Sequence, residues 1–355
     1  MGDVAVHAAC ASNQREANQG ESMPDDRIST EEAIIQQFLA PLAAGFPGAF
    51  GLQDDCAVAA PAPGHEFVFK TDAIAAGVHF LGDEDARDIG WKALAVNVSD
   101  LAAKGARPVG YLLSLSFPQA PTRAWMSGFT DGLAEAQRAF GMHLMGGDTD
   151  RRPGPVSITP MVIGEVPSGR MVRRATAVVG DIVFVSGTLG DAGLGLRLRK
   201  DRSLAASWGL AAEHSADLER RYLRPAPRLE LRDALRGAAR AAMDLSDGVV
   251  KDLGRMCKAS GVAARLGYSR LPVSAAFAAI RDVQPGEAGA ALFGGDDYEV
   301  LATVAGPDAN RFRAMAEASG CAVTAIGEII EGSGVSVLDD GQRPMLVATS
   351  GWDHF

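Results

Sequence analysis

The sequence predicts an α+β protein built from two domains. The chain has 355 residues, a length typical of two domains of ordinary size. Hydrophobic residues make up 47% of it, which suffices for a sizeable packed core and excludes global disorder. The expected strands and helices do not follow a strict strand–helix–strand repeat. This favours mixed sheets packed with helices over a doubly wound parallel sheet.

The first domain is expected over residues 27–166, after a polar N-terminal extension over 1–26 that lacks periodicity and is predicted to be disordered. Ser29 to Glu32 is typical of an N-cap followed by acidic first-turn residues, and predicts a helix that ends near Pro41. Apolar residues at helical spacing predict two further helices, over 87–104 and 122–141. The strands expected in this domain are 64–74, 110–117, 143–149 and 156–166.

A domain boundary is predicted at 166–169, and a second domain over 167–355. It is expected to begin with a strand, a glycine-rich turn and a helix over 180–196, before a helical excursion over 198–222. The remaining elements expected are a helix over 228–238, a strand–loop–helix unit over 241–261, a loop and strand over 291–304, and strand and turn over the last segments, 321–330 and 335–341.

Charge and composition exclude several classes of function. Acidic side chains outnumber basic ones by 44 to 34, a net charge of -10, which argues against a general binder of nucleic-acid backbone. The four cysteines show no CxxC spacing and are typical of reduced thiols. The sequence has no apolar run of about 18 residues and no secretory signal pattern. We therefore expect a cytoplasmic protein with no nucleic-acid and no membrane partner.

Aspartates recur in short motifs beside strand-like runs and glycine turns. These motifs are QDDCAV, KTDAI, NVSDLAAKGARP, GGDTD, MDLSDG and GGDDYE. For any single motif the simpler interpretation is a turn, because aspartate and glycine are common turn residues. Carboxylates that are buried together repel one another unless a cation neutralises them. The repetition therefore favours a hard cation with oxygen ligands, and Mg²⁺ suits a phosphate substrate.

Two other segments leave alternatives open. The turn over 187–196 follows a strand with glycines at a helix start, where free N–H groups can hold a phosphate, although glycines also permit close packing. The basic run over 169–174 is either a phosphate contact or a solvated surface. Lys92 and Lys104 are interpreted as surface residues of a helix. The chain contains neither a GxxxxGK[ST] loop nor the HRD and DFG motifs of protein kinases.

No nucleophile for covalent catalysis is recognisable in the sequence. Ser246 lies between Asp244 and Asp247, but no positioned base accompanies it. Cys56 is interpreted as a small apolar filler. His79 follows the Asp72 motif closely, and structural and functional roles are equally open for it.

Taken in order, the motifs resemble the thiamine-monophosphate kinase family, which belongs to the superfamily of aminoimidazole ribonucleotide synthetase. The resemblance extends from about residue 28 to 355 and rests on the aspartate motifs together with GVHF, GEVPSGRMVRR, RPAPRL and the terminal GWDHF. It implies a two-domain PurM-like fold, a homodimer formed through the N-terminal domains, and ATP bound between domains. It also implies transfer of the γ-phosphoryl group of ATP to thiamine monophosphate, giving thiamine diphosphate, with several Mg²⁺ ions.

The resemblance also implies roles for individual residues. The implied metal ligands are Asp55, Thr71, Asp72, Asp100, Asp148, Asp244 and Asp247. The implied ATP contacts are Gly147, Asp148, Arg174 and Ser246. The implied contacts of the thiamine substrate are His79, Asp296 and Trp352. No enzyme nucleophile is needed, because the acceptor phosphate itself can attack in line.

Three residues depart from the family pattern. Gln53 stands where glycine is usual, and Asp296 stands where glutamate is usual. Lys70 stands where a small residue such as serine is common. Its ammonium group either adds a phosphate contact or replaces one metal ion by a charge.

Four other functions are weighed against this one. A selenophosphate synthetase needs a reactive cysteine in a glycine-rich stretch, which Cys10 lacks, and a hydrogenase-maturation relative ends in cysteine, whereas this chain ends in Phe355. A catalytically silent metal–nucleotide binder is disfavoured by the nearly complete aspartate set. A metal-dependent phosphohydrolase is disfavoured because the basic run and the glycine-rich turn suit two anionic ligands better.

Overall fold

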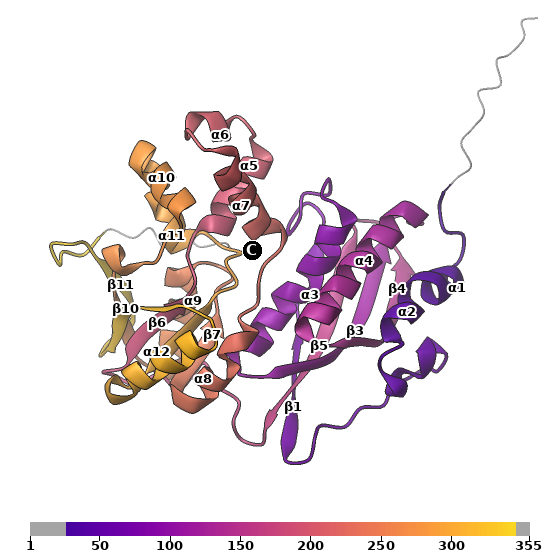
Figure 1. Ribbon diagram of the computed structural model, residues 1–355, viewed down its shortest axis with the longest axis horizontal. Coiled ribbons are helices and arrows are strands. Elements are labelled where there is room, and N and C mark those ends of the chain that lie inside the picture. The colour runs from indigo at the N-terminus through magenta and orange to yellow at the C-terminus, as the bar shows by residue number, and fades with distance from the viewer. Residues whose placement is uncertain (1–25, 346–355) are drawn as a thin grey trace, which may run out of the picture.

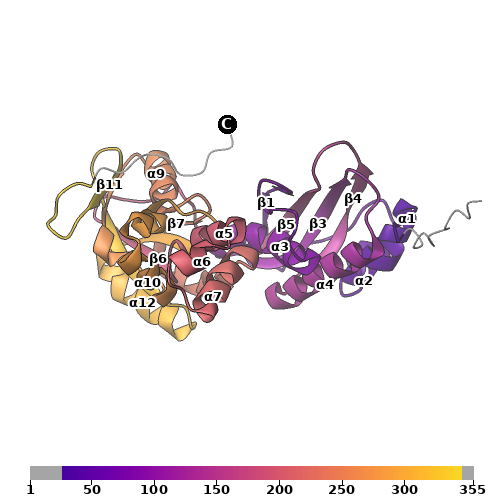
Figure 2. The same cartoon turned by 90° about the horizontal axis from the view of Figure 1, so that it is seen from above.

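The computed structural model describes residues 26–345, which form two lobes, each built around one β-sheet (Figures 1 and 2). Both sheets pack against helices, so the predicted α+β class is confirmed. The predictions for residues 1–25 and for Trp352 lie outside the described residues. Within 26–345, no helix is both long enough and apolar enough to cross a membrane.

The N-terminal sheet has the strand order β1–β5–β3–β4, and the short strand β2 also pairs with β5. Its strands are β1 (His65–Thr71), β2 (Ile74–Ala75), β3 (Arg107–Phe117), β4 (His143–Arg151) and β5 (Ser157–Pro167). β5 is antiparallel to β1 and β3, whereas β4 is parallel to β3. The strands predicted in this domain are therefore present. The boundary predicted near residue 166 coincides with the end of β5 and stays a prediction.

Helices α3 (Ala86–Ala103) and α4 (Arg123–Phe140) cover one face of this sheet (Figure 1). Side chains alternate between the two faces of a strand, and β3 shows this clearly. Leu115 is buried in the core with the helices, whereas Leu112 and Ser114 line a cavity on the opposite face. One face of the sheet thus builds the core and the other is available to a ligand.

The helix predicted to end near Pro41 ends close to it, at Ala43. Thr30 caps α1 (Glu31–Ile34) by accepting the N–H of Ala33 at 3.2 Å. A π-helical turn (Ile35–Leu39) follows and leads into α2 (Ala40–Ala43). Pro41 lies in the first turn of α2, where a missing N–H and a fixed φ are tolerated.

The second sheet has the strand order β11–β8–β10–β6–β9–β7. Its strands are β6 (Ile182–Ser186), β7 (Ala239–Asp244), β8 (Ala263–Gly267), β9 (Val300–Val304), β10 (Val323–Ile330) and β11 (Gly334–Leu338). Its helices are α5 (Asp191–Lys200), α6 (Leu204–Ser207), α7 (Ala212–Leu223), α8 (Arg232–Ala238), α9 (Val249–Ser260), α10 (Ala275–Val283), α11 (Ala290–Phe293) and α12 (Ala309–Ala318). The helical excursion predicted over 198–222 is present as the end of α5 with α6 and α7. β8, α10 and α12 were not predicted, and α11 lies at the start of a segment predicted as a loop and strand.

The two lobes meet along α3 (Figure 2). This helix packs against β7 and the 3₁₀ turn Leu229–Leu231. Trp91 of α3 donates its indole N–H to the carbonyl of Pro225 at 2.8 Å. Lys104, at the end of α3, donates to the carbonyl of Ala242 at 2.6 Å. Because α3 also carries Asp100, one of the predicted metal ligands lies at the junction of the lobes.

Candidate active site

Two predicted metal ligands at the end of β1, Thr71 and Asp72, lie on opposite sides of its sheet. Thr71 is paired with Met161 of β5, and both line the cavity on the open face. Lys70 points the other way, toward α3, because neighbouring side chains alternate along a strand. Asp72 follows Lys70 on that side. The amide of Asn97 in α3 holds its backbone, accepting the Asp72 N–H at 2.6 Å and donating to its carbonyl at 3.1 Å.

The cavity on the open face has a volume of about 800 Å³, within the range of small-molecule sites. It gathers four predicted site residues, namely Asp55, Thr71, Gly147 and Asp148. In the part of the chain that the structure describes, the carboxylates of Asp55 and Asp148 have no ion-pair or hydrogen-bond partner. Their oxygens are therefore available to a ligand or to a hard cation.

Gly147 allows β4 to lie closely beside β3 at this cavity. A Cβ atom at Gly147 would lie 1.9 Å from the carbonyl oxygen of Leu113, closer than any real contact allows. The pairing places Asp148 opposite Ser114 of β3, and both line the cavity. The glycine thus fixes the strand register that presents Asp148.

On the opposite side of the sheet, Lys70 joins two predicted metal ligands. Its Nζ lies 2.9 Å from Oδ2 of Asp72 and 2.7 Å from Oδ2 of Asp100. Asp244 at the end of β7 is buried, and burial followed by the nearby Asp100 carboxylate raises its pKa well above the usual value. Burial lowers the pKa of the neighbouring Lys104. Asp72, Asp100 and Asp244 therefore form a second acidic group at the lobe junction, and none of the three lines the cavity.

The loop between β7 and α9 carries Ser246 and Asp247. The backbone N–H groups of both are accepted by Oδ2 of Asp252, at 3.1 and 2.9 Å. Burial raises the pKa of Asp252 to about 6. Asp252 was not predicted from the sequence as a site residue. The Asp247 carboxylate forms ion pairs with Arg255 and Lys251, so a metal ion there would compete with two cations of its own lobe.

That loop is joined to the GGDDYE segment by backbone hydrogen bonds. The N–H of Asp296 donates to the carbonyl of Ser246 at 2.9 Å, and that of Tyr298 to the carbonyl of Leu245 at 2.8 Å. Asp296 and Tyr298 both have positive φ, 64° and 49°, a conformation that costs a non-glycine residue about 1–3 kcal/mol and is common at functional sites. The segment is thus held in a conformation that its local sequence does not favour.

Two residues predicted to contact the substrate, His79 and Asp296, are brought together by Lys92. Its Nζ lies 3.0 Å from Oδ2 of Asp296 and donates to the carbonyl of His79 at 3.0 Å. It also lies 3.7 Å from the centre of the Tyr222 ring, a cation–π contact. Lys92 is 3% exposed, so its interpretation as a surface residue is wrong. The sequence did contain a signal that Lys92 is buried: its spacing from Ile89 and Val96 places it on the same side of α3 as these two buried residues.

The glycine-rich turn after β6 does not offer the free N–H groups expected of a phosphate loop. The N–H of Gly190 donates to both carboxylate oxygens of Asp297, at 3.0 and 2.8 Å. Those of Gly187 and Leu189 donate to backbone carbonyls at 3.1 and 3.0 Å. The interpretation of this turn as a phosphate site is therefore wrong for these three N–H groups, because each already donates to an acceptor that is distant in sequence. Arg174, in the basic run, is exposed and lies close enough to Lys104 to act on its pKa.

The oxygen atoms of the predicted metal ligands suit Mg²⁺. Among residues 26–345, no three His, Cys, Asp or Glu side chains converge so as to hold a metal ion by themselves. Mg²⁺ usually takes only one or two carboxylates and completes its shell with water and substrate phosphates. The free oxygens of Asp55 and Asp148 meet that requirement, and the clustered charges near Asp244 favour a cation.

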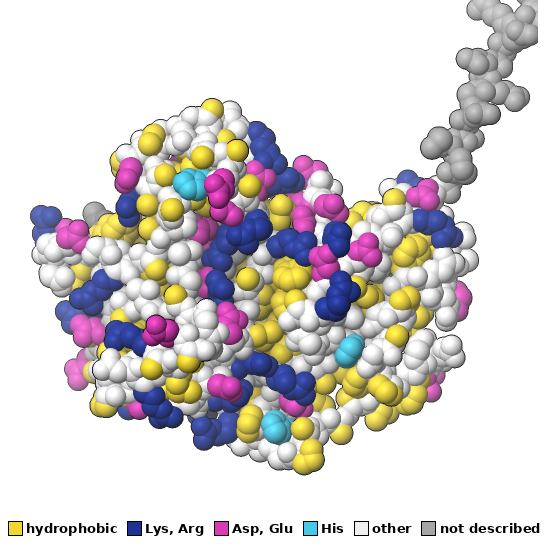
Figure 3. Space-filling view, in the orientation of Figure 1, with side chains coloured by type: hydrophobic (Ala, Val, Ile, Leu, Met, Phe, Trp, Pro, Cys, Tyr) yellow, Lys and Arg dark blue, Asp and Glu magenta, His cyan; other side chains and the backbone are white. Residues whose placement is uncertain are grey.

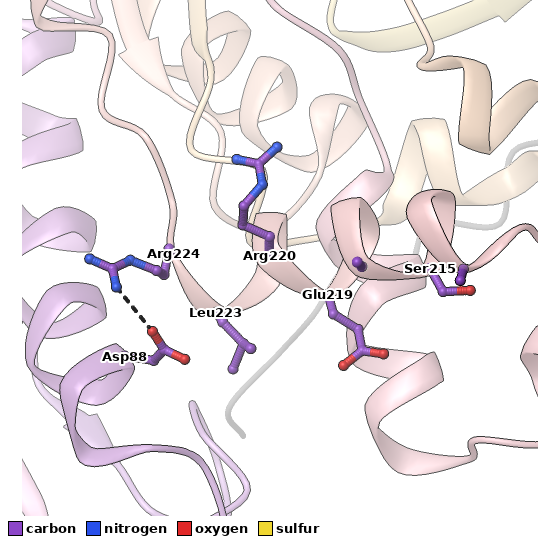
Figure 4. Close-up of a pocket in the computed structure, with 8 residues that line it drawn as sticks. Asp88, Ser215, Glu219, Arg220, Leu223 and Arg224 are labelled. Carbon is purple, nitrogen blue, oxygen red and sulfur yellow. Dashed lines mark hydrogen bonds and ion pairs between the residues drawn. The ribbon is translucent and has the colours of Figure 1, made fainter.

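A second cavity, of about 470 Å³, lies between α7 and the start of α3 and contains none of the predicted site residues (Figure 4). Its walls include Asp88 and Arg224, whose carboxylate and guanidinium are 3.3 Å apart. Lys and Arg side chains gather along the junction of the lobes on the face seen in Figure 3. The Asp88–Arg224 pair joins the lobes at this junction.

Comparisons with known proteins show the family of the chain. Residues 53–166 match the family model of the AIR synthase related protein N-terminal domain, and 178–340 match its C-terminal domain. A thiamine-monophosphate kinase from Caulobacter vibrioides is 40% identical over 92% of this chain and 91% of its own length.

Two solved structures share the fold over most of their length. The thiamine-monophosphate kinase from Stenotrophomonas maltophilia is 40% identical, with a TM-score of 0.73 over 82% of this chain and 90% of that chain. The structure of AaThiL complexed with AMPPCP and TMP is 32% identical, with a TM-score of 0.72 over 87% and 97%. The chain therefore belongs to the thiamine-monophosphate kinase family, within the AIR synthase related proteins.

Proposed function

We propose that the chain phosphorylates thiamine monophosphate to thiamine diphosphate, with ATP as the phosphoryl donor. The observation that carries the proposal is 40% identity with a kinase of this name over nearly the whole chain. A 32% identical relative whose structure is described as a complex with AMPPCP and TMP supports the same two substrates. The cavity that gathers Asp55, Gly147 and Asp148 supports placing the nucleotide there.

The proposed site has three parts. The metal ligands are Asp55, Thr71, Asp72, Asp100, Asp148, Asp244 and Asp247, the ATP contacts are Gly147, Asp148, Arg174 and Ser246, and the substrate contacts are His79 and Asp296. Mg²⁺ ions bound there would screen the repulsion between the two phosphate groups and the charge that develops during transfer. The cavity pair of Asp55 and Asp148 is the part with the fewest competing partners.

The proposed reaction is a direct in-line transfer of the γ-phosphoryl group. The oxygen of the acceptor phosphate attacks the γ-phosphorus of ATP, and the bond to the bridging oxygen of ADP breaks. No general base is required, because the acceptor phosphate is already ionised near neutral pH. The protein then contributes chiefly orientation and electrostatic stabilisation. For this role Lys92 holds Asp296 and His79 together, and Asp252 holds the loop of Ser246.

We further propose two domains, 27–166 and 167–355, and a homodimer formed through the N-terminal domain, with the enzyme acting in the cytoplasm. Exposed apolar side chains of the N-terminal domain support the dimer: Phe50 is 51%, Val58 67% and Phe69 61% exposed. The free thiols of Cys56, Cys257 and Cys321 support a reducing compartment.

The activity is tested by incubating purified full-length protein with ATP, Mg²⁺ and thiamine monophosphate, and separating the products by chromatography. We expect thiamine diphosphate and ADP in equal amounts, and no product after chelation of divalent ions. Absence of thiamine diphosphate across a range of Mg²⁺ concentrations contradicts the proposal. Equal turnover with free thiamine would indicate a different kinase.

A further inference from the structure

Lys70 lies between two carboxylates that come from different elements. Its ammonium nitrogen is 2.9 Å from Oδ2 of Asp72, just after β1, and 2.7 Å from Oδ2 of Asp100, in α3. These separations are those of charge-assisted hydrogen bonds between an ammonium and a carboxylate. One cation thus joins the end of the strand to the helix.

The backbone fixes this position of Lys70. The residue sits inside β1, paired with Val162 of β5, and a change of face would require the whole strand to slip by one residue. The backbone of Asp72 is held as well, because Asn97 binds both its N–H and its carbonyl. The lysine side chain is only 29% exposed. Its ammonium group is therefore a built part of the acidic group at the lobe junction, and not a mobile surface charge.

The charges around Lys70 explain why a cation is needed between Asp72 and Asp100. Asp72 and Asp100 face the ammonium directly, and the buried Asp244 lies close enough to Asp100 for the two carboxylates to repel. The other nearby lysine, Lys104, gives a hydrogen bond to the carbonyl of Ala242. The side chain of Asp100 is 24% exposed and that of Asp72 is 53% exposed, and carboxylates gathered this closely repel one another unless a cation lies beside them. A divalent ion bridging the same two oxygens could not occupy the point already filled by the ammonium.

We propose that Lys70 is an internal cation that replaces one divalent ion between Asp72 and Asp100. This inference rests on the metal assignment of the proposed function and deepens it. Lys70 holds the strand end and α3 together whether or not Mg²⁺ is present. The divalent ions of the reaction are then left to the other carboxylates, chiefly Asp55 and Asp148. Lys70 is a positioning residue, and removal of its charge opens a place for one more divalent ion.

The test counts divalent ions rather than products. Mn²⁺, a hard cation with the same preference for oxygen ligands, is titrated into the full-length protein, and free Mn²⁺ is followed by electron paramagnetic resonance. Lys70→Ser and the bulkier Lys70→Met are each expected to bind one more Mn²⁺ per protomer than the unsubstituted chain. A neighbouring charge shifts such equilibria by about tenfold or more, so the gained site is expected at least about tenfold tighter than any counterpart in the unsubstituted chain.

Three matched variants make the test specific. Lys70→Arg keeps a cation and is expected to bind as many ions as the unsubstituted chain. Lys258→Ser removes an exposed lysine from α9 and is expected to change nothing. Adding Asp100→Asn to Lys70→Ser or Lys70→Met is expected to remove the gained ion. Circular dichroism identifies the variants that keep the fold, and Lys70→Met retains most of the buried methylene contacts if Lys70→Ser does not.

Equal Mn²⁺ binding by the folded Lys70 variants and the unsubstituted chain overturns the inference, and so does a gained ion that survives Asp100→Asn. The kinase assay of the unsubstituted chain is independent of this count. If that chain makes thiamine diphosphate and the variants gain no ion, only the inference fails. If the variants gain the ion but the unsubstituted chain makes no product, the internal cation stands and the proposed reaction fails.

Discussion

Two acidic regions of the molecule use their carboxylates in opposite ways. Glu299, in the GGDDYE segment, is fully buried and has partners built around it: Arg221 at 2.8 Å, Arg228 at 2.7 Å and the Ser186 hydroxyl at 2.6 Å. Asp55 and Asp148 have no such side-chain partner anywhere in residues 26–345.

The difference shows what an acidic motif in the sequence can mean. A carboxylate whose cations are supplied by the chain contributes to the fold, and removing it leaves buried arginines unpaired. A carboxylate that faces a cavity without a partner contributes nothing comparable to folding, and its charge is available to a bound ion or ligand. Mutations should therefore separate the two regions by phenotype, one through stability and the other through turnover.

The largest effect is expected at the buried site. Glu299→Gln leaves Arg221 and Arg228 without their common carboxylate, so the free energy of unfolding should fall by about 3–5 kcal/mol, as for other broken buried ion pairs. Urea denaturation followed by circular dichroism measures this. As a control, Glu328→Gln breaks a pair with Arg265 whose side chains are about half exposed, and should cost less than about 1 kcal/mol. Similar losses in the two variants would remove the distinction.

Asp148→Asn should show the opposite phenotype. We expect kcat/KM to fall by about 10²–10³-fold, because the variant loses a carboxylate that helps to stabilise the charge developing in the transition state. The free energy of unfolding should stay the same or rise slightly. Steady-state kinetics with urea denaturation of the same preparation measures both. Asp150→Asn removes an equal charge from the same strand outside the cavity and is the matched control. A loss of stability without a loss of turnover would mean that Asp148, like Glu299, stabilises the fold and does not bind a ligand.

A smaller effect is expected at Lys92, which lies between the two kinds of site because it is buried like Glu299 but neutralises a predicted substrate contact. Lys92→Met keeps the length of the side chain and removes the cation from Asp296 and from the His79 carbonyl. We expect KM for thiamine monophosphate to rise about tenfold, the equivalent of about 1.4 kcal/mol, with a smaller change in kcat. Exposed Lys258→Met is the control. An unchanged KM would mean that Lys92 serves packing alone.

Local patterns in the sequence predicted much of the fold and several of the loops that meet at the site. Apolar spacing predicted α3 and α4 nearly to their ends; α4 buries one face, whereas α3 is buried on nearly all sides because it lies between its own sheet and the second lobe. Strand alternation could also have separated Thr71 from Lys70 and Asp72. The partners of these residues could not be predicted in the same way. Asp297 takes the N–H of Gly190 from 107 residues away, and no local pattern indicates such a contact.

The smallest effect is the pH dependence of the stability that Glu299 contributes. Burial acts to raise the pKa of Glu299, but Arg228 and Arg221 outweigh it and hold the pKa below its usual 4.5. A carboxyl with a lowered pKa in the folded state contributes stability above its unfolded pKa and loses it as the pH falls through the folded value.

The stability difference between the unsubstituted chain and Glu299→Gln should therefore be largest above about pH 4.5 and shrink in more acid solution, by about 1.4 kcal/mol for each unit by which the pKa is lowered. Urea denaturation of both proteins between about pH 3 and 7 measures this. A Glu299→Gln difference that stayed constant into acid would mean that the arginines stabilise the side chain through its shape and not through its charge.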